Sequence, residues 1–168
     1  MVLSTANPDV GRKSDFLARV DRENRALMNT RTRLAPGCKI KALVVDDHPI
    51  NREMLIRTLT MLGVDLDTAR SGLEAVEKVR AWLPDIIFMD VRMMVTDGKE
   101  GLLAIQKEFD HIKIAILTAS GLDYRREEYI KAGCHYLISK PFHIESIHEC
   151  LGRLVGAEFE YKEVGQTA

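Results

Sequence analysis

Several sequence features that mark common protein classes are missing from this 168-residue chain. No apolar run approaches about 18 residues, so no transmembrane helix is expected. The apolar stretch at the start is too short for a secretory signal peptide. The formal net charge is −1, which provides no general attraction to nucleic acid or to a membrane surface. These absences predict a cytoplasmic protein that contacts neither nucleic acid nor membrane directly.

Cysteine is scarce as well. The three cysteines, Cys38, Cys134 and Cys150, form an odd set without C-x-x-C spacing. Disulfide frameworks and zinc clusters need paired, regularly spaced cysteines. The five histidines are scattered and have no metal-ligand spacing with a cysteine. The sequence therefore predicts free thiols in a reducing compartment, and histidines with surface or packing roles.

Short motifs that carry common enzyme chemistry are also absent. The stretch "DDHPIN" (46–51), which follows the first apolar run, contains no glycine. A Walker phosphate loop or a G-x-G-x-x-G turn requires glycines at that place. There is likewise no G-x-S-x-G elbow and no H-E-x-x-H pair. Nucleotide hydrolysis, dinucleotide binding and the common hydrolase chemistries are therefore disfavoured.

What is present is a regular alternation of short apolar runs and amphipathic stretches from residue 39 onward. The predicted strands are 40–45, 64–69, 85–90, 112–120 and 135–141. The predicted helices are 50–63, 71–83, 99–109, 123–133 and 145–156. Ser71 and Glu74 have the S-x-x-E spacing of a capping box at the start of the second helix. Alternating strands and helices imply a parallel sheet with right-handed crossovers, so the predicted fold is a doubly wound five-stranded α/β sandwich.

The segment before this alternation has a different composition. Residues 1–38 are rich in arginine, and apolar positions favour a helix over roughly 14–30, before the chain-breaking "APG" at 35–37. Two interpretations stay open for this segment: a linker or docking helix, and a dimerisation helix. We divide the chain into an N-terminal linker or helix (1–38), a regular domain (39–156) and a C-terminal tail (157–168).

Polar residues stand at the carboxyl ends of four predicted strands, which is where doubly wound sheets place their sites. They are Asp46, Asp47, Asp90, Thr118 and Lys140. A single one of them could be a helix cap, but a convergent set favours a site. Three close carboxylates cannot all ionise without a cation, and hard oxygen ligands with open positions suit Mg²⁺. One carboxylate could then accept a phosphoryl group, with Lys140 as a second positive charge and Thr118 as a hydrogen-bond donor.

Four stretches together resemble the receiver domain of two-component response regulators. They are "VVDDHPINREML", "DIIFMDVRMMVTDG", "ILTAS" and "YLISKPF", and the resemblance covers residues 39–156. The resemblance implies a flavodoxin-like fold with strand order 2-1-3-4-5. It also implies a domain that accepts a phosphoryl group in two-component signalling. The preceding "RLAPG" resembles the segment before receivers that are attached to hybrid histidine kinases. This resemblance suggests that the chain is the C-terminal receiver of such a kinase.

The resemblance assigns a role to each site residue. Asp90 matches the phosphoacceptor aspartate, Thr118 the switch hydroxyl and Lys140 the phosphate-binding lysine, and the Lys140–Pro141 bond is expected to be cis. Asp46 and Asp47 match the acidic pair that binds Mg²⁺, and Asp90 and the backbone carbonyl of Arg92 complete the protein ligands. The implied partner is a histidine kinase or a phosphotransfer protein, and a homodimer is a further expectation. Such a domain is no enzyme beyond its own phosphorylation and dephosphorylation.

The chain departs from the family pattern at three positions. Leu137 stands where an aromatic is usual, and Tyr136 lies one residue earlier, which in a strand turns it to the other face. Met94 replaces the usual proline after Met93, so the loop after Asp90 loses a rigid residue. The residue two positions after Asp90 is Arg92, whose side chain could contact the acyl phosphate or lie on the surface.

Two rival functions remain. An aspartyl-nucleophile phosphatase on a similar sheet would need a second aspartate two residues after Asp90, where this chain has Arg92. A degenerate receiver that serves only as a protein-interaction module would not need all of Asp46, Asp47, Asp90, Thr118 and Lys140.

Overall fold

The computed structural model describes residues 18–19, 22, 30–95, 97–119 and 125–163. Its centre is a parallel sheet of five strands in the order β3-β2-β4-β5-β6. These strands are β3 Asp65–Ala69, β2 Lys41–Val45, β4 Ile86–Asp90, β5 Lys113–Thr118 and β6 Tyr136–Ser139. Counted from β2 as the first strand, this is the order 2-1-3-4-5, so the predicted fold class is confirmed.

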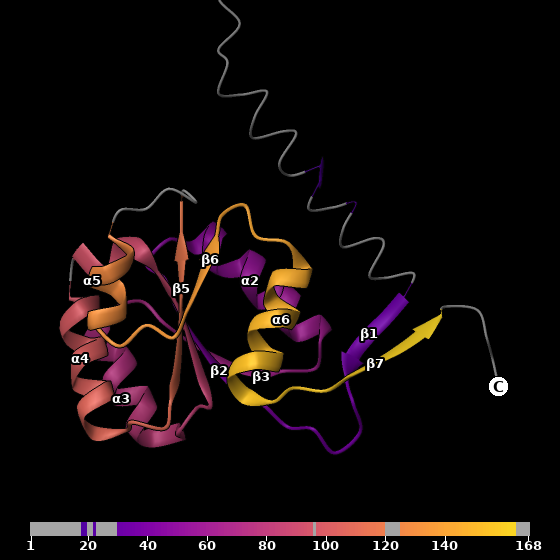
Figure 1. Cartoon of the computed structure of the whole chain (residues 1–168), viewed down its shortest axis with the longest axis horizontal. Helices are drawn as coiled ribbons and strands as arrows, with labels where there is room; N and C mark the ends of the chain where they lie inside the picture. The colour runs from indigo at the N-terminus through magenta and orange to yellow at the C-terminus, as the bar shows by residue number, and fades with distance from the viewer. Residues whose placement is uncertain (1–17, 20–21, 23–29, 96, 120–124, 164–168) are drawn as a thin grey trace, which may run out of the picture.

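Helices cover both faces of this sheet (Figure 1). One face carries α3 Gly72–Trp82, α4 Gly98–Glu108 and α5 Arg126–Lys131, and the other carries α2 Pro49–Met61 and α6 Ile144–Val155. All five residues of the central strand β4 are buried, as expected for a parallel strand covered on both faces. The predicted helix 123–133 is too long, because α5 begins only at Arg126; residues 120–124 lie outside the described part. Among the described helices, none is both long enough and apolar enough to cross a membrane.

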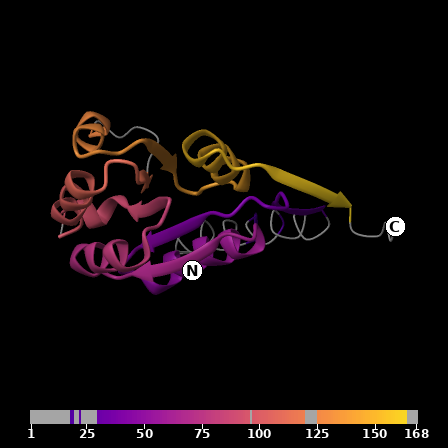
Figure 2. The ribbon, with the colours of Figure 1, turned by 90° about the horizontal axis from the view of Figure 1, so that it is seen from below.

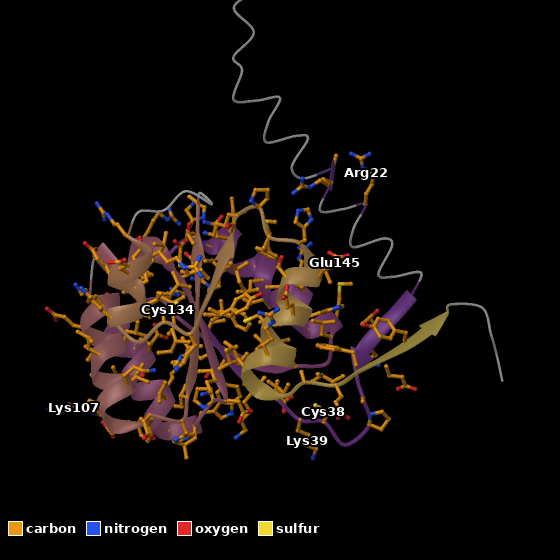
Figure 3. All side chains as sticks on the ribbon, viewed as in Figure 1. Arg22, Cys38, Lys39, Lys107, Cys134 and Glu145 are labelled. Carbon is orange, nitrogen blue, oxygen red and sulfur yellow. The ribbon has the colours of Figure 1, made fainter. Side chains whose placement is uncertain are left out.

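None of the three cysteines takes part in a disulfide. Cys134 and Cys150 are buried and Cys38 is half-buried, and all three are free thiols. Figure 3 shows Cys134 against the sheet and Cys38 on the loop after the first strand of the chain. Burial raises the pKa of the Cys150 thiol to about 12. A thiol with so high a pKa is an inert packing group near neutral pH.

The predicted capping box at the start of α3 is confirmed. Ser71 is the N-cap residue, and its Oγ accepts a hydrogen bond from the Glu74 backbone N–H at 3.1 Å. Glu74 reaches back and accepts from the Arg70 backbone N–H at 2.8 Å. The N–H of Glu74, in the first turn of α3, and the N–H of Arg70, just before the N-cap, are thereby satisfied.

We expect the change Ser71→Ala to lower the free energy of unfolding by about 1 kcal/mol, because it removes this capping acceptor. Urea unfolding followed by circular dichroism measures the loss. His48, the N-cap residue of α2, makes no side-chain capping bond, so His48→Ala is the control and is expected to change stability by less than about 0.5 kcal/mol. Equal losses in the two variants would contradict the capping role.

A second, smaller sheet lies beside α6 and was not predicted. It pairs β1 Thr30–Leu34 with β7 Phe159–Glu163 in antiparallel register, from Thr30 opposite Glu163 to Leu34 opposite Phe159. We call this pair of strands the terminal ribbon. Figure 2 shows β7 running outward beyond α6 alongside β1.

The terminal ribbon corrects the sequence interpretation at both ends of the chain. Residues 30–34 were assigned to a linker or helix and residues 159–163 to a tail, but each segment is a strand. The reason is that each strand is stabilised by its distant partner and by packing of Leu34 and Phe159 against the core on the α2 and α6 face. Most of the predicted helix over 14–30 lies outside the described residues, although residues 18–19 and 22 are helical. The domain limits at 38/39 and 156/157 remain a proposal.

Helices α3 and α4 approach each other closely at two glycines. A Cβ atom added to Gly101 in α4 would lie 2.7 Å from the carbonyl oxygen of Gly72 and 2.9 Å from its Cα atom. Gly72 and Gly101 are both buried. The backbones of the two helices therefore meet where neither residue has a side chain. Gly98, at the start of α4, lies against the Met93 backbone in the same way, and this contact supports the 3-10 turn Val91–Val95 that follows β4.

Candidate functional site

The polar strand-end residues meet at one edge of the sheet, as the parallel topology requires. Asp90 is the last residue of β4 and Thr118 the last residue of β5, while Asp46 and Lys140 directly follow β2 and β6. The registers place these ends side by side: Val45 is opposite Met89, Asp90 opposite Leu117, and Thr118 opposite Ser139. The residues gather because strands of one direction end at the same edge.

Asp90 is the centre of this cluster. Only 3% of its surface is exposed. Its Oδ2 accepts a hydrogen bond from Lys140 Nζ at 2.7 Å and lies 3.1 Å from a terminal guanidinium nitrogen of Arg92, and its Oδ1 accepts from the Arg92 backbone N–H at 2.9 Å. Burial works against ionisation of Asp90, but the hydrogen bonds from Lys140 and Arg92 outweigh it and lower the pKa of Asp90 to about 2. Asp90 is therefore a buried carboxylate that stays ionised near neutral pH.

Asp46 has the opposite balance. It is buried, and its Oδ1 accepts a hydrogen bond from the His48 backbone N–H at 2.8 Å. Burial and, to a smaller extent, the neighbouring Asp90 raise the pKa of Asp46 despite that hydrogen bond. The backbone carbonyl of Asp46 accepts from Arg52 at 2.8 Å, which holds the start of α2 against this edge. An added cation would relieve the electrostatic cost at Asp46.

Acidification should reveal the opposing shifts at Asp90 and Asp46. The pKa of Asp90 is lowered from an ordinary 3.8 to about 2, so its contribution to stability is complete above about pH 4 and is lost as the pH falls through about 2. The raised pKa of Asp46 acts in the other direction and offsets part of this loss. We expect the wild-type protein to lose up to about 2 kcal/mol more than Asp90→Asn between about pH 5 and about pH 2. Denaturant titrations at each pH measure it, and parallel curves for the two proteins would contradict it.

The remaining predicted residues fall in two environments. Thr118 is buried, and its backbone carbonyl accepts a hydrogen bond from the Lys140 N–H at 2.6 Å, which ties the ends of β5 and β6 together. Asp47, by contrast, is exposed beside Asp46. Asp47 interacts with the cluster through its negative charge. The pKa of the Arg92 guanidinium is raised mainly by Asp90, and to a smaller extent by the charges of Asp46 and Asp47.

The donor atoms at this edge suit a hard cation. Among the described residues, no group of three or more His, Cys, Asp or Glu side chains is arranged to hold a metal as it stands. Two carboxylates nevertheless face one point, because a single guanidinium nitrogen of Arg92 lies 3.1 Å from Asp90 Oδ2 and 3.9 Å from Asp46 Oδ1. A cationic group thus lies between two carboxylate oxygens. Mg²⁺ prefers such ligands.

The departures from the family pattern each have a structural outcome. Leu137 packs against the core on the α3, α4 and α5 face, and Tyr136 packs on the opposite face with α6, so the one-residue offset does separate them. Met93 and Met94 are both buried, so the turn after Asp90 is held by packing in place of the proline. The Lys140–Pro141 bond is cis, as the resemblance implied. The side chain of Arg92 contacts the Asp90 carboxylate while 55% of it stays exposed, so a contact with an acyl phosphate remains a prediction.

Sequence reasoning missed one feature of this edge. A cavity of about 790 Å³ opens beside Asp90 and is lined by Asp46 and Lys140 together with apolar residues such as Met54 and Phe142. It lies between α2 and the segment after β6. No local motif signals it, because its wall comes from elements far apart in the sequence.

Comparison with known proteins agrees with this geometry. The family profile of the response regulator receiver domain matches residues 42–152. The chemotaxis protein CheY of Thermotoga maritima is 35% identical over 115 residues, which are 68% of this chain and 96% of that protein. The sensor protein EvgS of Escherichia coli O157:H7 is 33% identical over 116 residues, or 69% of this chain. The matched region is only 10% of the length of EvgS.

Solved structures give the same result. The receiver domain of the sensor histidine kinase PA1611 from Pseudomonas aeruginosa PAO1, described with magnesium coordinated in its active-site cleft, has a TM-score of 0.63 and 29% identity. The similarity covers 71% of this chain and 99% of that one. The receiver domain of Ssk1 from Saccharomyces cerevisiae, solved with the histidine phosphotransfer protein Ypd1, has a TM-score of 0.62 and 25% identity over 69% of this chain and 88% of that one.

Proposed function

Because the chain belongs to the response regulator receiver family, we propose that it receives a phosphoryl group on Asp90 in two-component signalling. The observation that carries this assignment is the state of Asp90: a buried carboxylate, ionised through Lys140 at 2.7 Å, at the carboxyl edge of the sheet. An ionised carboxylate is the nucleophile that acyl phosphate formation needs. The donor would be a phosphohistidine of a histidine kinase or phosphotransfer protein, or a small phosphodonor.

In the proposed transfer, an Oδ atom of Asp90 forms a bond to phosphorus while the bond from phosphorus to the histidine nitrogen breaks. The electron pair of that bond returns to the imidazole. Lys140 contacts Asp90 before transfer and is placed to contact the phosphoryl oxygens afterwards. The cavity beside Asp90 provides room for the donor group.

Asp46, Asp47, Asp90 and the Arg92 backbone carbonyl would hold Mg²⁺ at this edge. Bound there, the ion would neutralise charge on the phosphoryl oxygens during transfer. The support from this chain is the pair of buried carboxylates, Asp46 and Asp90, that face a common point. Asp47 belongs to the set on family resemblance and on its position beside Asp46.

The response to phosphorylation would spread from Thr118 and Lys140. Thr118 is buried at the end of β5, and Lys140 is tied to it through the backbone, so a new charge on Asp90 acts on both strands. We propose that this shifts a pre-existing equilibrium of the surface formed by α5, β6 and α6. With Leu137 packed in the core at the usual aromatic position, the coupling relies on Thr118 without an aromatic partner.

We further propose that the domain works in the cytoplasm, turns over no other substrate, and contacts neither nucleic acid nor membrane itself. A homodimer, and attachment as the C-terminal receiver of a hybrid kinase, stay as proposals.

One experiment separates this function from its rivals. The protein is incubated with Mg²⁺ and acetyl phosphate, or with beryllofluoride, and modification is followed by intact mass and by NMR. Stable modification of one aspartate supports the receiver function. Sustained turnover of varied phosphate esters would instead show a phosphatase, which the Arg92 guanidinium beside Asp90 disfavours because it cannot act as the second acid. Failure to bind either reagent would leave an interaction module.

A further inference from the structure

The side chain of Arg92 lies across the acidic edge of the site. Its Nε and a terminal nitrogen lie 3.4 and 3.1 Å from Asp90 Oδ2, and the terminal nitrogen is 3.9 Å from Asp46 Oδ1. The two carboxylates are buried, whereas 55% of the Arg92 side chain is exposed. The guanidinium is therefore anchored at its tip by buried charges and remains free to swing into solvent.

The two cations of the cluster are placed differently. The Lys140 ammonium forms an ion pair with Asp90 at 2.7 Å, whereas the Arg92 guanidinium lies within ion-pair distance of both Asp90 and Asp46. The position that a divalent cation would need in order to touch both carboxylates is thus the one that the guanidinium holds. The backbone carbonyl of Arg92, the ligand that the family pattern assigns, belongs to the same residue and is unaffected by where the side chain lies.

We propose that the Arg92 guanidinium is a resident counter-ion that competes with Mg²⁺ for Asp46 and Asp90. This inference rests on the proposed function, since it concerns the metal site used for phosphorylation. Metal binding is then an exchange: the guanidinium leaves both carboxylates as the ion arrives. A site that is open for a fraction of the time has its affinity reduced by that fraction. A guanidinium docked for about nine-tenths of the time therefore weakens Mg²⁺ binding about tenfold.

The test compares Arg92→Met with a matched control, Arg80→Met, by calorimetric titration of the unphosphorylated full chain with Mg²⁺ at constant ionic strength. Arg80 has the same side-chain exposure of 55% and pairs with the Glu108 carboxylate at 2.8 Å, away from the site. Both variants remove one positive charge; Arg92→Met removes the ion pairs with Asp90 and Asp46, and Arg80→Met removes the ion pair with Glu108. Methionine at position 92 keeps the backbone carbonyl, so the ligand set is preserved. We expect Arg92→Met to bind Mg²⁺ about tenfold more tightly than wild type and Arg80→Met to bind as wild type does.

A second readout observes the displacement in the wild-type protein. The Nε–H resonances of Arg92 and Arg80 both report hydrogen bonds to carboxylates. Saturation with Mg²⁺ should shift the Arg92 resonance and speed its exchange with water, and leave the Arg80 resonance in place. An unmoved Arg92 resonance in the metal-bound protein would overturn the inference even if the variant failed to fold.

The outcomes distinguish this inference from the proposed function. Equal Mg²⁺ affinity in wild type and Arg92→Met overturns the competition and leaves the receiver function standing. No Mg²⁺ binding to either protein, together with no modification by acetyl phosphate, overturns both. A gain in affinity in Arg92→Met alone, with the Arg92 resonance displaced, supports the resident counter-ion.

Discussion

Asp90→Asn is expected to reduce phosphoryl incorporation from acetyl phosphate to background. The amide oxygen of asparagine is too weak a nucleophile to form an acyl phosphate. The change also removes the negative charge that draws Lys140 and Arg92 to this point. Intact mass after incubation with Mg²⁺ and acetyl phosphate measures the modified fraction.

The control for this variant is Asp67→Asn. Asp67 also pairs with a lysine, Lys78, at 2.9 Å, but it lies on β3 and its carboxylate is half-exposed. That variant should accept phosphate as the wild type does. Undiminished incorporation in Asp90→Asn would move the acceptor to another carboxylate and would refute the assignment. An NMR spectrum of each variant establishes that the fold is retained.

The second large effect is expected in stability. Gly101→Ala should lower the free energy of unfolding by about 2 kcal/mol or more. A helix interior gains about 1 kcal/mol from such a change, but here the new methyl group would lie 2.7 Å from the Gly72 carbonyl oxygen. Backbone atoms of a neighbouring helix cannot move aside as a flexible side chain can, so α3 and α4 must separate. Denaturant unfolding measures the difference.

Gly152 provides the matched control for the crowding at Gly101. It lies inside α6, and a Cβ atom added there would have its nearest neighbour at 3.8 Å, which is ordinary contact. Gly152→Ala should therefore raise stability by about 0.5–1 kcal/mol through helix propensity alone. The two glycine variants are expected to change stability in opposite directions. A stabilised Gly101→Ala protein would show that the packing of α3 on α4 is looser than described.

The sheet and its order were predictable because buried parallel strands leave a local trace. The stretch "DIIFMD" reads as a buried strand by itself, and Ser71 with Glu74 marks a helix start within four residues. The terminal ribbon leaves no such trace. "TRTRL" and "FEYKE" are short and polar, and each becomes a strand only through a partner that is distant in the sequence.

For the candidate site, the sequence predicted which residues come together but could not predict the directions of their side chains. Topology alone brought Asp90, Lys140 and Asp46 to one edge, because the end of a parallel strand fixes where the next side chain lies. The direction of the Arg92 side chain could not be predicted, since a long side chain has many rotamers of similar energy. The direction that this side chain takes depends on two buried carboxylates, Asp90 at the end of β4 and Asp46 just after β2. The cavity beside Asp90 was missed for a related reason: its shape is set by the distance between elements.

The terminal ribbon has a mechanical consequence. Strand β1 runs toward the domain and β7 runs away from it, so the chain enters and leaves at the same far end, where Thr30 lies opposite Glu163. Tension applied to these two ends would break the pairs between β1 and β7 one after another, from Thr30 with Glu163 to Leu34 with Phe159. A two-stranded ribbon is marginally stable by itself. We therefore expect β1 and β7 to separate at low force, before the sheet that holds Asp90 is pulled. The ribbon would then protect the sheet edge that holds Asp90 from strain in the residues on either side of the domain.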